Sequence, residues 1–421
     1  MQTELSPELI NHPEGIEVKR LLSNCVHCGF CTATCPTYQL LGDELDGPRG
    51  RIYLIKQMAE GKKATTKTRE HLDRCLTCRN CESTCPSGVQ YGHLLDIGRK
   101  WAEEQTDARP VKERAVRWLL KEFVSRAELF TPAMTVGRLV KPLLPKVLKK
   151  KIPDLNPSSS KNYSVKDISP TQTMLMLNGC VQPGMFPQIN AATQRVFRAL
   201  GVQIIAPTQV GCCGALKFHL NDQESAKAQM KNNIDSWWPH IEHDKVTAII
   251  MNASGCGVAV KDYGYILRDD PKYAEKAKLV SLLTKDVSEL LLDFQSLIIE
   301  RIGATHDRNL VYHPPCTLQH GQKISGKVEN LLTSLGVKVQ LCADSHICCG
   351  SAGTYSILQA SLSDQLREQK LNHLLNACES SGASEIVSGN VGCISQLQQD
   401  QVPVKHWIEV LDDLFYTSLK H

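Results

Sequence analysis

Two runs of cysteines carry the strongest chemical signal in this 421-residue sequence. The first spans Cys25 to Pro36 and the second Cys75 to Pro86, and both read C-x2-C-x2-C-x3-C-P. Three closely spaced thiolates can point at one centre, whereas the fourth, led away by proline, ligates the other cluster of a [4Fe-4S] pair. We therefore predict two [4Fe-4S] clusters with crossed ligands. One set is Cys25, Cys28, Cys31 and Cys85, and the other is Cys75, Cys78, Cys81 and Cys35.

Disulfides and zinc are the alternative uses of these cysteines. A disulfide framework requires an exported chain, and structural zinc typically takes four ligands from two C-x2-C pairs. Neither explains a third cysteine after two further residues and a fourth before proline, repeated in both runs. The grouping of the 18 cysteines into ligand-like runs also suits a reducing compartment, so we favour the iron-sulfur interpretation.

Charge and hydropathy favour a cytoplasmic chain. The first residues lack the basic and apolar regions of a secretion signal, and no apolar run approaches the roughly 18 residues of a membrane span. The formal net charge of +4 falls near zero once two clusters add about −2 each. We therefore expect no nucleic-acid partner and at most peripheral contact with the inner face of the cytoplasmic membrane.

Residues 1–106 predict a mostly helical ferredoxin-type domain, with helices over 14–24, 51–60, 67–74 and 91–104. Residues 107–172 are expected to form a basic helical segment and a linker, and 109–151 hold 12 lysines or arginines against three glutamates. Such helices can lie on an anionic membrane or can pack on a neighbouring domain with their charges in water. We favour packing, because three prolines from Pro132 to Pro145 interrupt a long surface helix.

From residue 173 strands alternate with helices, which predicts parallel sheets covered by helices. In the first half we expect strands over 173–177, 202–206 and 246–251 and helices over 188–200, 222–238, 272–281 and 285–300. In the second we expect strands over 309–313, 337–341 and 385–388 and helices over 327–335 and 362–378. Cysteines 180, 212 and 256 recur 136, 136 and 137 residues later, at 316, 348 and 393. The fold class is therefore a multidomain α+β chain with a duplicated α/β domain, over 173–300 and 301–421.

The repeated cysteines are candidates for a further site, because loops at the carboxyl ends of parallel strands converge where ligands bind. Three interpretations stay open: a further iron-sulfur or redox centre, which we favour, small buried hydrophobes, and a catalytic thiol or vicinal disulfide. The candidates are Cys180, Cys212, Cys213 and Cys256, and Cys316, Cys348, Cys349 and Cys393. Near the second set, His313, His320 and His346 are possible ligands or proton relays. We expect Cys342 and Cys378 to be structural.

The longer strings resemble the iron-sulfur subunit of bacterial glycolate oxidase, or glycolate dehydrogenase, nearly end to end. The resemblance is carried by CVHCGFCTATCPTYQLLGDELDGPRGRIYLIKQ, HLDRCLTCRNCESTCPSG, GCCGA, NNIDSWWP, ASGCG, CTLQH, SHICCGSAGTY and VKHWIEVL. It implies that separate FAD-binding subunits oxidise glycolate to glyoxylate, and that this chain passes their electrons towards the respiratory chain, to quinone or another acceptor. The eight cysteines of the two runs match the family's cluster ligands position by position.

The repeated halves also resemble the CCG domains of heterodisulfide reductase subunits, which hold a noncubane cluster through a C…CC…C-x-x-C set. Here Cys256 and Cys393 lack the last cysteine of that set, so each half has four cysteines and the noncubane cluster is in doubt. The four cysteines of each half are enough for an ordinary four-cysteine metal site.

No G-x-G-x-x-G fingerprint or P-loop is present, so we expect no flavin or nicotinamide in this chain. A two-electron oxidation of a 2-hydroxy acid needs a hydride acceptor, which must then sit in a partner. The alternatives are the corresponding subunit of a lactate or anaerobic glycerol 3-phosphate dehydrogenase, and a thiol reductase that uses the CCG cysteines. A zinc-stabilised nucleic-acid-binding module has only the basic segment in its favour.

Overall fold

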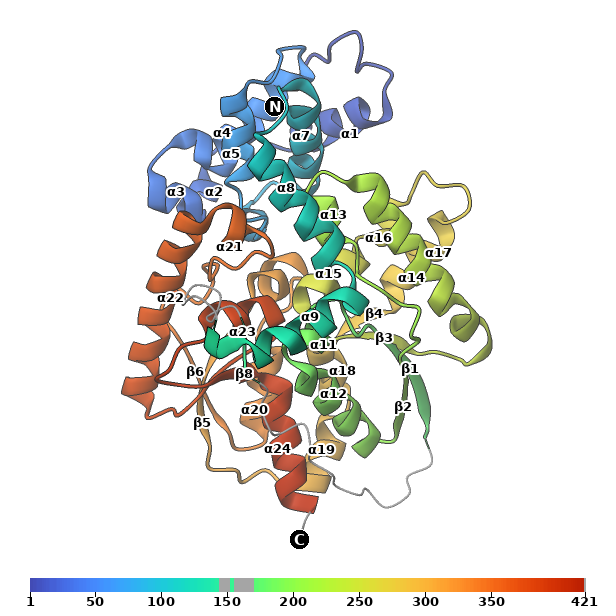
Figure 1. The fold of residues 1–421 in the computed structure, drawn as a ribbon, viewed down its shortest axis with the longest axis vertical. Helices are drawn as coiled ribbons and strands as arrows, with labels where there is room; N and C mark the ends of the chain where they lie inside the picture. The colour runs from blue at the N-terminus through green and yellow to red at the C-terminus, as the bar shows by residue number, and fades with distance from the viewer. Residues whose placement is uncertain (144–151, 155–169, 420–421) are drawn as a thin grey trace.

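The computed structural model describes residues 1–143, 152–154 and 170–419. Figure 1 shows the N-terminal helices at one end of an elongated molecule, with the two sheets and their helices filling the rest. Most of the predicted linker at 151–172 lies outside the described residues. The domain limits at residues 106, 172 and 300 stay predictions.

The N-terminal part is helical, as the sequence predicts. Its helices pack through a core of fully buried apolar side chains that includes Leu22, Ile55 and Leu94. The four predicted helices are present as α1, α4, α5 and α7, and short helices lie within both runs and directly after the first. The bounds are α1 Pro13–Ser23, α2 Phe30–Ala33, α3 Pro36–Leu41, η1 Glu44–Asp46, α4 Pro48–Ala59, α5 Thr66–Asp73, α6 Asn80–Thr84 and α7 Tyr91–Gln105.

The basic segment runs from the N-terminal part down across the sheets, as α8 (Val111–Leu119), a π-helical turn (Leu120–Val124) and α9 (Ala127–Leu139) (Figure 1). Its charges pair with the rest of the chain. Three ion pairs join it to other parts of the chain: Arg109 with Asp73 at 2.7 Å, Lys121 with Asp222 at 3.1 Å, and Glu122 with Lys217 at 2.9 Å. The segment therefore packs on its neighbours. The sequence argument about proline was wrong in part, because α9 continues through Pro132.

The first sheet is parallel with the order β2-β1-β3-β4, and the second repeats it as β6-β5-β7-β8. The central strand β1 aligns Gln172 with Val202 of β2, and β5 aligns Asn309 with Lys338 of β6 in the same way. The bounds are β1 Gln172–Met176, β2 Val202–Ile205, β3 Ala248–Met251, β4 Thr284–Asp286, β5 Asn309–His313, β6 Lys338–Leu341, β7 Ile386–Ser388 and β8 Val404–His406. The predicted duplication is therefore confirmed.

The helices of the two halves share one hydrophobic core, and α12 and α24 pack against each other across the halves with an Arg195–Asp412 ion pair of 2.7 Å. Two predictions fail here in part: α14 continues through Pro239 to His243 instead of ending at residue 238, and the helix expected over 285–300 is the end of strand β4 followed by two helices, α18 and α19. The bounds are α11 Gln182–Met185, α12 Pro187–Ala199, α13 Ala215–His219, α14 Gln223–His243, α15 Ser254–Lys261, α16 Tyr263–Ile266, α17 Ala274–Leu283, α18 Val287–Asp293, α19 Gln295–Ile302, α20 Lys327–Ser334, α21 Tyr355–Leu358, α22 Ala360–Ser381, α23 Val391–Leu397 and α24 Trp407–Leu419.

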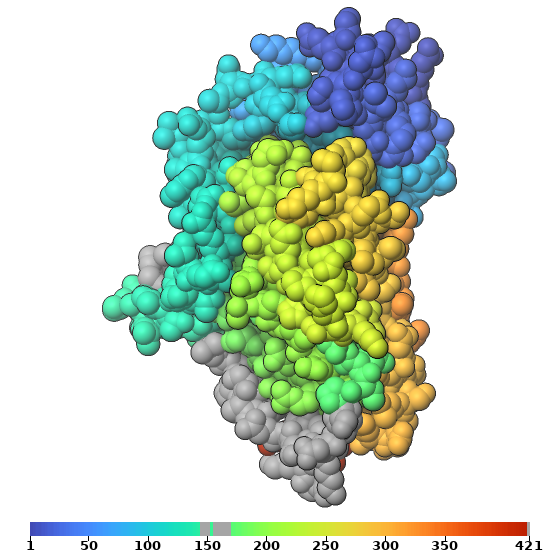
Figure 2. Space-filling model, turned by 90° about the vertical axis from the view of Figure 1, so that its right-hand side faces the viewer, coloured from blue at the N-terminus to red at the C-terminus, as the bar shows by residue number. Residues whose placement is uncertain are grey.

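Figure 2 shows the N-terminal part capping the first half, with the basic segment along one side. Among the described helices, none combines the length and the apolar character needed to cross a membrane.

Candidate metal centres

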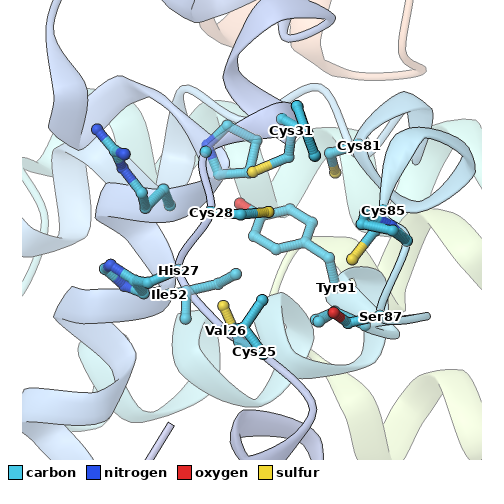
Figure 3. A pocket seen from close by; sticks show the side chains of 16 residues that line it. Cys25, Val26, His27, Cys28, Cys31, Ile52, Cys81, Cys85, Ser87 and Tyr91 are labelled. Atoms are coloured by element: carbon cyan, nitrogen blue, oxygen red, sulfur yellow. The ribbon is translucent and has the colours of Figure 1, made fainter.

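The first cysteine set surrounds a pocket at the N-terminal end of the molecule. The loop between its cysteines curls tightly, with left-handed backbone at His27 (φ 58°) and Gly29 (φ 87°), and this turn aims successive side chains inward. Figure 3 shows the sulfurs of Cys25, Cys28 and Cys31 around this pocket, together with those of Cys85 and Cys81 from the other run. The donor set is four thiols without a competing disulfide.

The pKa shifts group the cysteines in the same way. Burial raises the pKa of the Cys31 thiol to about 11, and the neighbouring thiols that add to this are Cys25, Cys85 and Cys28. Burial also raises the pKa of Cys81, and there the neighbouring thiols are Cys78, Cys75 and Cys35. In each set the fourth cysteine comes from the opposite run, as crossed ligation requires. A bound metal would hold these thiols as thiolates.

The two sets differ in exposure. In the first, Cys28 is exposed and Cys31 and Cys85 are half-buried, whereas all four cysteines of the second set are buried. Beside Cys28, Val26 is 68% exposed and Phe30 is 63% exposed. Two exposed apolar side chains therefore lie beside the exposed Cys28.

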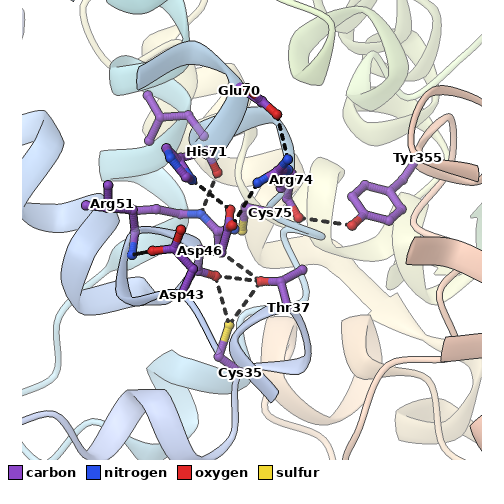
Figure 4. A network of polar contacts seen from close by, with 12 residues as sticks. Cys35, Thr37, Asp43, Asp46, Arg51, Glu70, His71, Arg74, Cys75 and Tyr355 are labelled. Atoms are coloured by element: carbon purple, nitrogen blue, oxygen red, sulfur yellow. Dashed lines mark hydrogen bonds and ion pairs between the residues drawn. The ribbon is translucent and has the colours of Figure 1, made fainter. Parts of the chain in front are cut away.

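A polar network supports the second set (Figure 4). Arg51, which is fully buried, donates to the carbonyl of His71 at 2.7 Å and pairs with Asp46 at 3.4 Å. Asp46 also pairs with Arg74 at 2.9 Å, and its carbonyl accepts a hydrogen bond from Thr37, which contacts the Cys35 sulfur at 3.3 Å. The buried carboxylate therefore has two cationic partners, and the network fixes the loop that carries Cys35.

The second set lies against the second half of the sheet region. Cys78 belongs to one apolar cluster with Cys348, Leu76 and Tyr355. Polar contacts cross the same boundary: Asn80 donates to the carbonyl of His346 at 3.2 Å, and Tyr355 donates to that of Arg74 at 3.1 Å. His320 joins them, with its ring 3.0 Å from the hydroxyl of Ser83. The sequence did not predict this contact.

The cysteines of each repeated half come together at the carboxyl ends of the strands, as predicted. In the second half the sulfurs of Cys316 and Cys348 are 3.8 Å apart, and Cys349 interacts with both Cys348 and Cys393. In the first half Cys212 contacts Cys180 and Cys213, and Cys213 contacts Cys256. Gly350 follows the second pair with φ 84°, and a side chain there would meet the Ser363 carbonyl at 2.6 Å. Glycine is therefore required for the CCG turn.

The three histidines considered with the second half take different positions. His313 is buried beside Cys349 and Cys393, and their ligand atoms lie within 4.8 Å of one another. The side chain of His320 contacts Ser83 and the His346 carbonyl, so it serves the contact with the N-terminal part.

Cys342 and Cys378 lie in the shared hydrophobic core, which fits a structural role.

A cleft opens between the N-terminal part and the first half, with about 190 Å³ of internal space. Its wall includes residues next to three candidate ligands: Arg79 beside Cys78, Gly255 beside Cys256 and Thr317 beside Cys316. Asp262 pairs with Arg79 at 2.6 Å and lies 3.6 Å from His93. Burial opposes ionisation of Asp262, but these two partners lower its pKa to about 2. The sequence offered no signal for this cleft, because its walls come from distant segments.

Comparisons with known proteins agree with these observations. Residues 21–89 match the model of the 4Fe-4S dicluster domain, and residues 174–261 and 310–398 match that of the cysteine-rich CCG domain. The chain is 48% identical over 98% of both sequences to the glycolate oxidase iron-sulfur subunit of Escherichia coli K12. It belongs to this family. A probable glycolate oxidase iron-sulfur subunit of Bacillus subtilis is 32% identical over 90% of this chain and 88% of that protein.

More distant members of the comparison share part of the architecture. Lactate utilization protein A of an Exiguobacterium strain is 24% identical over 56% of this chain and 94% of its own length. The resemblance stated from the sequence is therefore confirmed, and the glycolate oxidase relatives cover far more of the chain than the lactate-linked one.

Proposed function

We propose that this chain is the electron-carrying subunit of a glycolate oxidase complex and holds two [4Fe-4S] clusters. The observation that carries the proposal is that Cys85 of the second run lines the pocket of the first run together with Cys25, Cys28 and Cys31, as crossed ligation expects. Each set fits a cluster in donor type and number, and bound clusters accept and release single electrons. The relatives at 48% and 32% identity supply the substrate, glycolate.

Electrons enter, in this proposal, at the first set. Cys28 is exposed there, and Val26 and Phe30 offer an apolar surface around it. The partner is an FAD-binding subunit that oxidises glycolate to glyoxylate, since no nucleotide-binding motif occurs in this chain. All four cysteines of the second set are buried, so in this proposal the electrons pass to it inside the molecule.

The docking surface can be tested with the double variant Val26→Asp, Phe30→Asp. The two carboxylates should weaken association with the flavin subunits by at least about tenfold, because a central apolar contact is replaced by charges that lose solvent on binding. Iron and sulfide contents should stay as in the unmodified chain. The matched control is Leu129→Asp, Val136→Asp on α9, where the side chains are 48% and 58% exposed but far along the chain from Cys28. Equal loss of binding in both variants would contradict this entry site.

Beyond the second set, we propose that the CCG cysteines of both halves bind further metal or redox centres. Cys78 packs against Cys348, so the second set is the one next to them. The acceptor, a quinone or another respiratory carrier, is proposed to bind in the cleft beside Arg79, whose walls also include His93 and Asp262. Ala259→Trp on α15 would fill this cleft, and should slow quinone reduction about tenfold while leaving reduction of a dye by the flavin unchanged. Equal rates with quinone would exclude the cleft.

Location follows from the same proposal. The chain works in the cytoplasm, and any membrane contact is peripheral and limited to the exposed apolar residues of the basic segment, such as Trp118, Val136 and Leu139. Pelleting with anionic vesicles, compared with Trp118→Ser, checks this.

The overall function is tested by anaerobic purification of the complex. We expect about eight irons and eight acid-labile sulfides from the two clusters, plus any metal in the CCG halves. FAD-binding subunits should co-purify, and glycolate should reduce the clusters faster than lactate or glycerol 3-phosphate. An iron-free chain would refute the electron-carrying role, and preference for lactate or glycerol 3-phosphate would refute the assignment of glycolate.

A further inference from the structure

The two CCG halves differ at one position beside their cysteines. His313 ends β5 three residues before Cys316, and the corresponding residue of the first half is Leu177, three residues before Cys180. The two sheets have the same strand order, His313 is the last residue of β5, and Leu177 directly follows β1 and still bonds the β3 carbonyl of Ile250, so both residues lie at the carboxyl end of a central strand. A buried leucine needs only apolar neighbours, whereas the ring nitrogens of a buried imidazole need hydrogen-bond partners or a metal ion.

The surroundings of His313 leave its polar atoms unpaired. The residue is 1% exposed, and neither ring nitrogen has a hydrogen-bond partner among the described residues. Burial of an unpaired polar group costs roughly 1–3 kcal/mol, and native proteins rarely accept that cost without a partner that a protein-only structure does not contain. A metal ion is such a partner for a neutral imidazole.

Two thiols are positioned to complete the site. Cys349 comes from the CCG turn and Cys393 from the start of α23, and their sulfurs lie with a ring nitrogen of His313 within 4.8 Å of one another. In a tetrahedral zinc site, bonds of about 2.3 Å to sulfur and 2.0–2.1 Å to nitrogen separate the ligands by about 3.5–3.8 Å. The three side chains therefore need only a small closure around one ion. They are too close together to enclose a four-iron cube.

Charge and hydrogen bonding agree with a divalent ion. Two thiolates neutralise one dication, so the buried site would carry no net charge. The side-chain amide of Asn390 donates to the Cys393 sulfur at 3.6 Å, which is the kind of contact that orients a thiolate ligand. Cys348 interacts with Cys349 and lies next to the open fourth position.

We propose that the second CCG half binds a single divalent ion that favours tetrahedral thiolate and imidazole ligands, zinc or iron(II), through His313, Cys349 and Cys393. The first half, with Leu177 in place of the histidine, has only sulfur ligands. This proposal deepens the assignment of metal centres to the CCG halves made above, and fixes one of them as mononuclear.

The test compares three variants of the full chain, purified anaerobically and analysed for zinc, iron and acid-labile sulfide. His313→Ala should lose one zinc or one iron per chain with no loss of sulfide. Leu177→Ala, an equally buried truncation at the matched position, should keep the ion. His313→Cys should retain it, and X-ray absorption at the edge of that metal should show a nitrogen ligand replaced by sulfur.

The contrary outcomes are distinct. Unchanged metal content in His313→Ala, or no nitrogen ligand in the unmodified chain, overturns the proposal. Loss of several irons together with sulfide overturns the single ion in favour of a cluster. If His313→Ala does not fold, the absorption spectra of the unmodified chain and His313→Cys decide. The [4Fe-4S] electron paramagnetic resonance signals are counted in the same samples. If these signals are absent, the proposed electron-carrying role is wrong, and this result does not depend on the metal content at His313.

Discussion

The two cysteine runs have the same spacing but opposite environments. The first has an exposed Cys28 flanked by exposed Val26 and Phe30, while every cysteine of the second set is buried. The difference comes from the residues between the ligands. In the second run Leu76 and Asn80 contact the second CCG half, as does Arg74, which lies just before it. A shared motif therefore fixes the cofactor type, and the residues around it fix whether the site meets a partner or the interior.

The variants with the largest expected effect on this contrast each remove one predicted ligand, Cys28 from the first set or Cys78 from the second. Cys28→Ser should lose the first cluster and weaken the second, because the runs share ligands, leaving about four of eight irons. Cys78→Ser should lose the second cluster and also place a hydroxyl in the apolar cluster with Cys348 and Tyr355, so its melting temperature should fall further. Iron analysis, paramagnetic resonance and thermal unfolding check both. Two full cluster signals in Cys28→Ser would contradict the crossed ligation.

A second test removes the support of the buried set. Arg51→Met takes one cationic partner from the buried Asp46 and should cost about 3–5 kcal/mol of unfolding free energy. The control is Arg49→Met, since Arg49 and its partner Glu44 are 37% and 40% exposed and such a pair contributes at most about 1 kcal/mol. Anaerobic urea unfolding, followed by cluster absorbance and circular dichroism, measures both. Similar midpoints for the two variants would show that the network does not stabilise the second set.

Local patterns predicted most of the elements but not every boundary. Helices α1, α4, α5 and α7 and strand β5 follow from apolar periodicity. Strands β4 and β8 were not predicted, because each has three residues and a lysine at its centre, whereas the equally short β7 begins with the apolar pair Ile386 and Val387. Pro132 was expected to interrupt a helix, and the helix predicted over 222–238 ended just before Pro239. Each proline removes one hydrogen bond from its helix, and in α14 the buried Ile234 and Trp237 hold the preceding turn in place.

The sequence could indicate which cysteines are candidate ligands, but not what surrounds them. The spacing within each run is a local feature of the sequence, whereas the neighbours of a run come from distant segments. The contact of Cys78 with Cys348 joins residues far apart in the chain, and no spacing rule reports it. His313 was one of three histidines near the second set, and only its burial and unpaired nitrogens separate it from His320, whose ring contacts Ser83 and the His346 carbonyl.

The smallest expected effect concerns one hydrogen bond to the buried set. The hydroxyl of Tyr91 donates to the Cys75 sulfur at 3.8 Å inside the core, and such donors stabilise the more negative, reduced cluster. Tyr91→Phe keeps the ring, so packing should hold, while the loss of about 1 kcal/mol should lower the reduction potential of the second cluster by roughly 40 mV. Tyr91 also lines the pocket of the first set, but among the described contacts its hydroxyl bonds only the Cys75 sulfur, so the potential of the first cluster should change less. Redox titration followed by paramagnetic resonance measures both potentials, and a larger shift in the first cluster would reverse the assignment of Cys75 to the buried set.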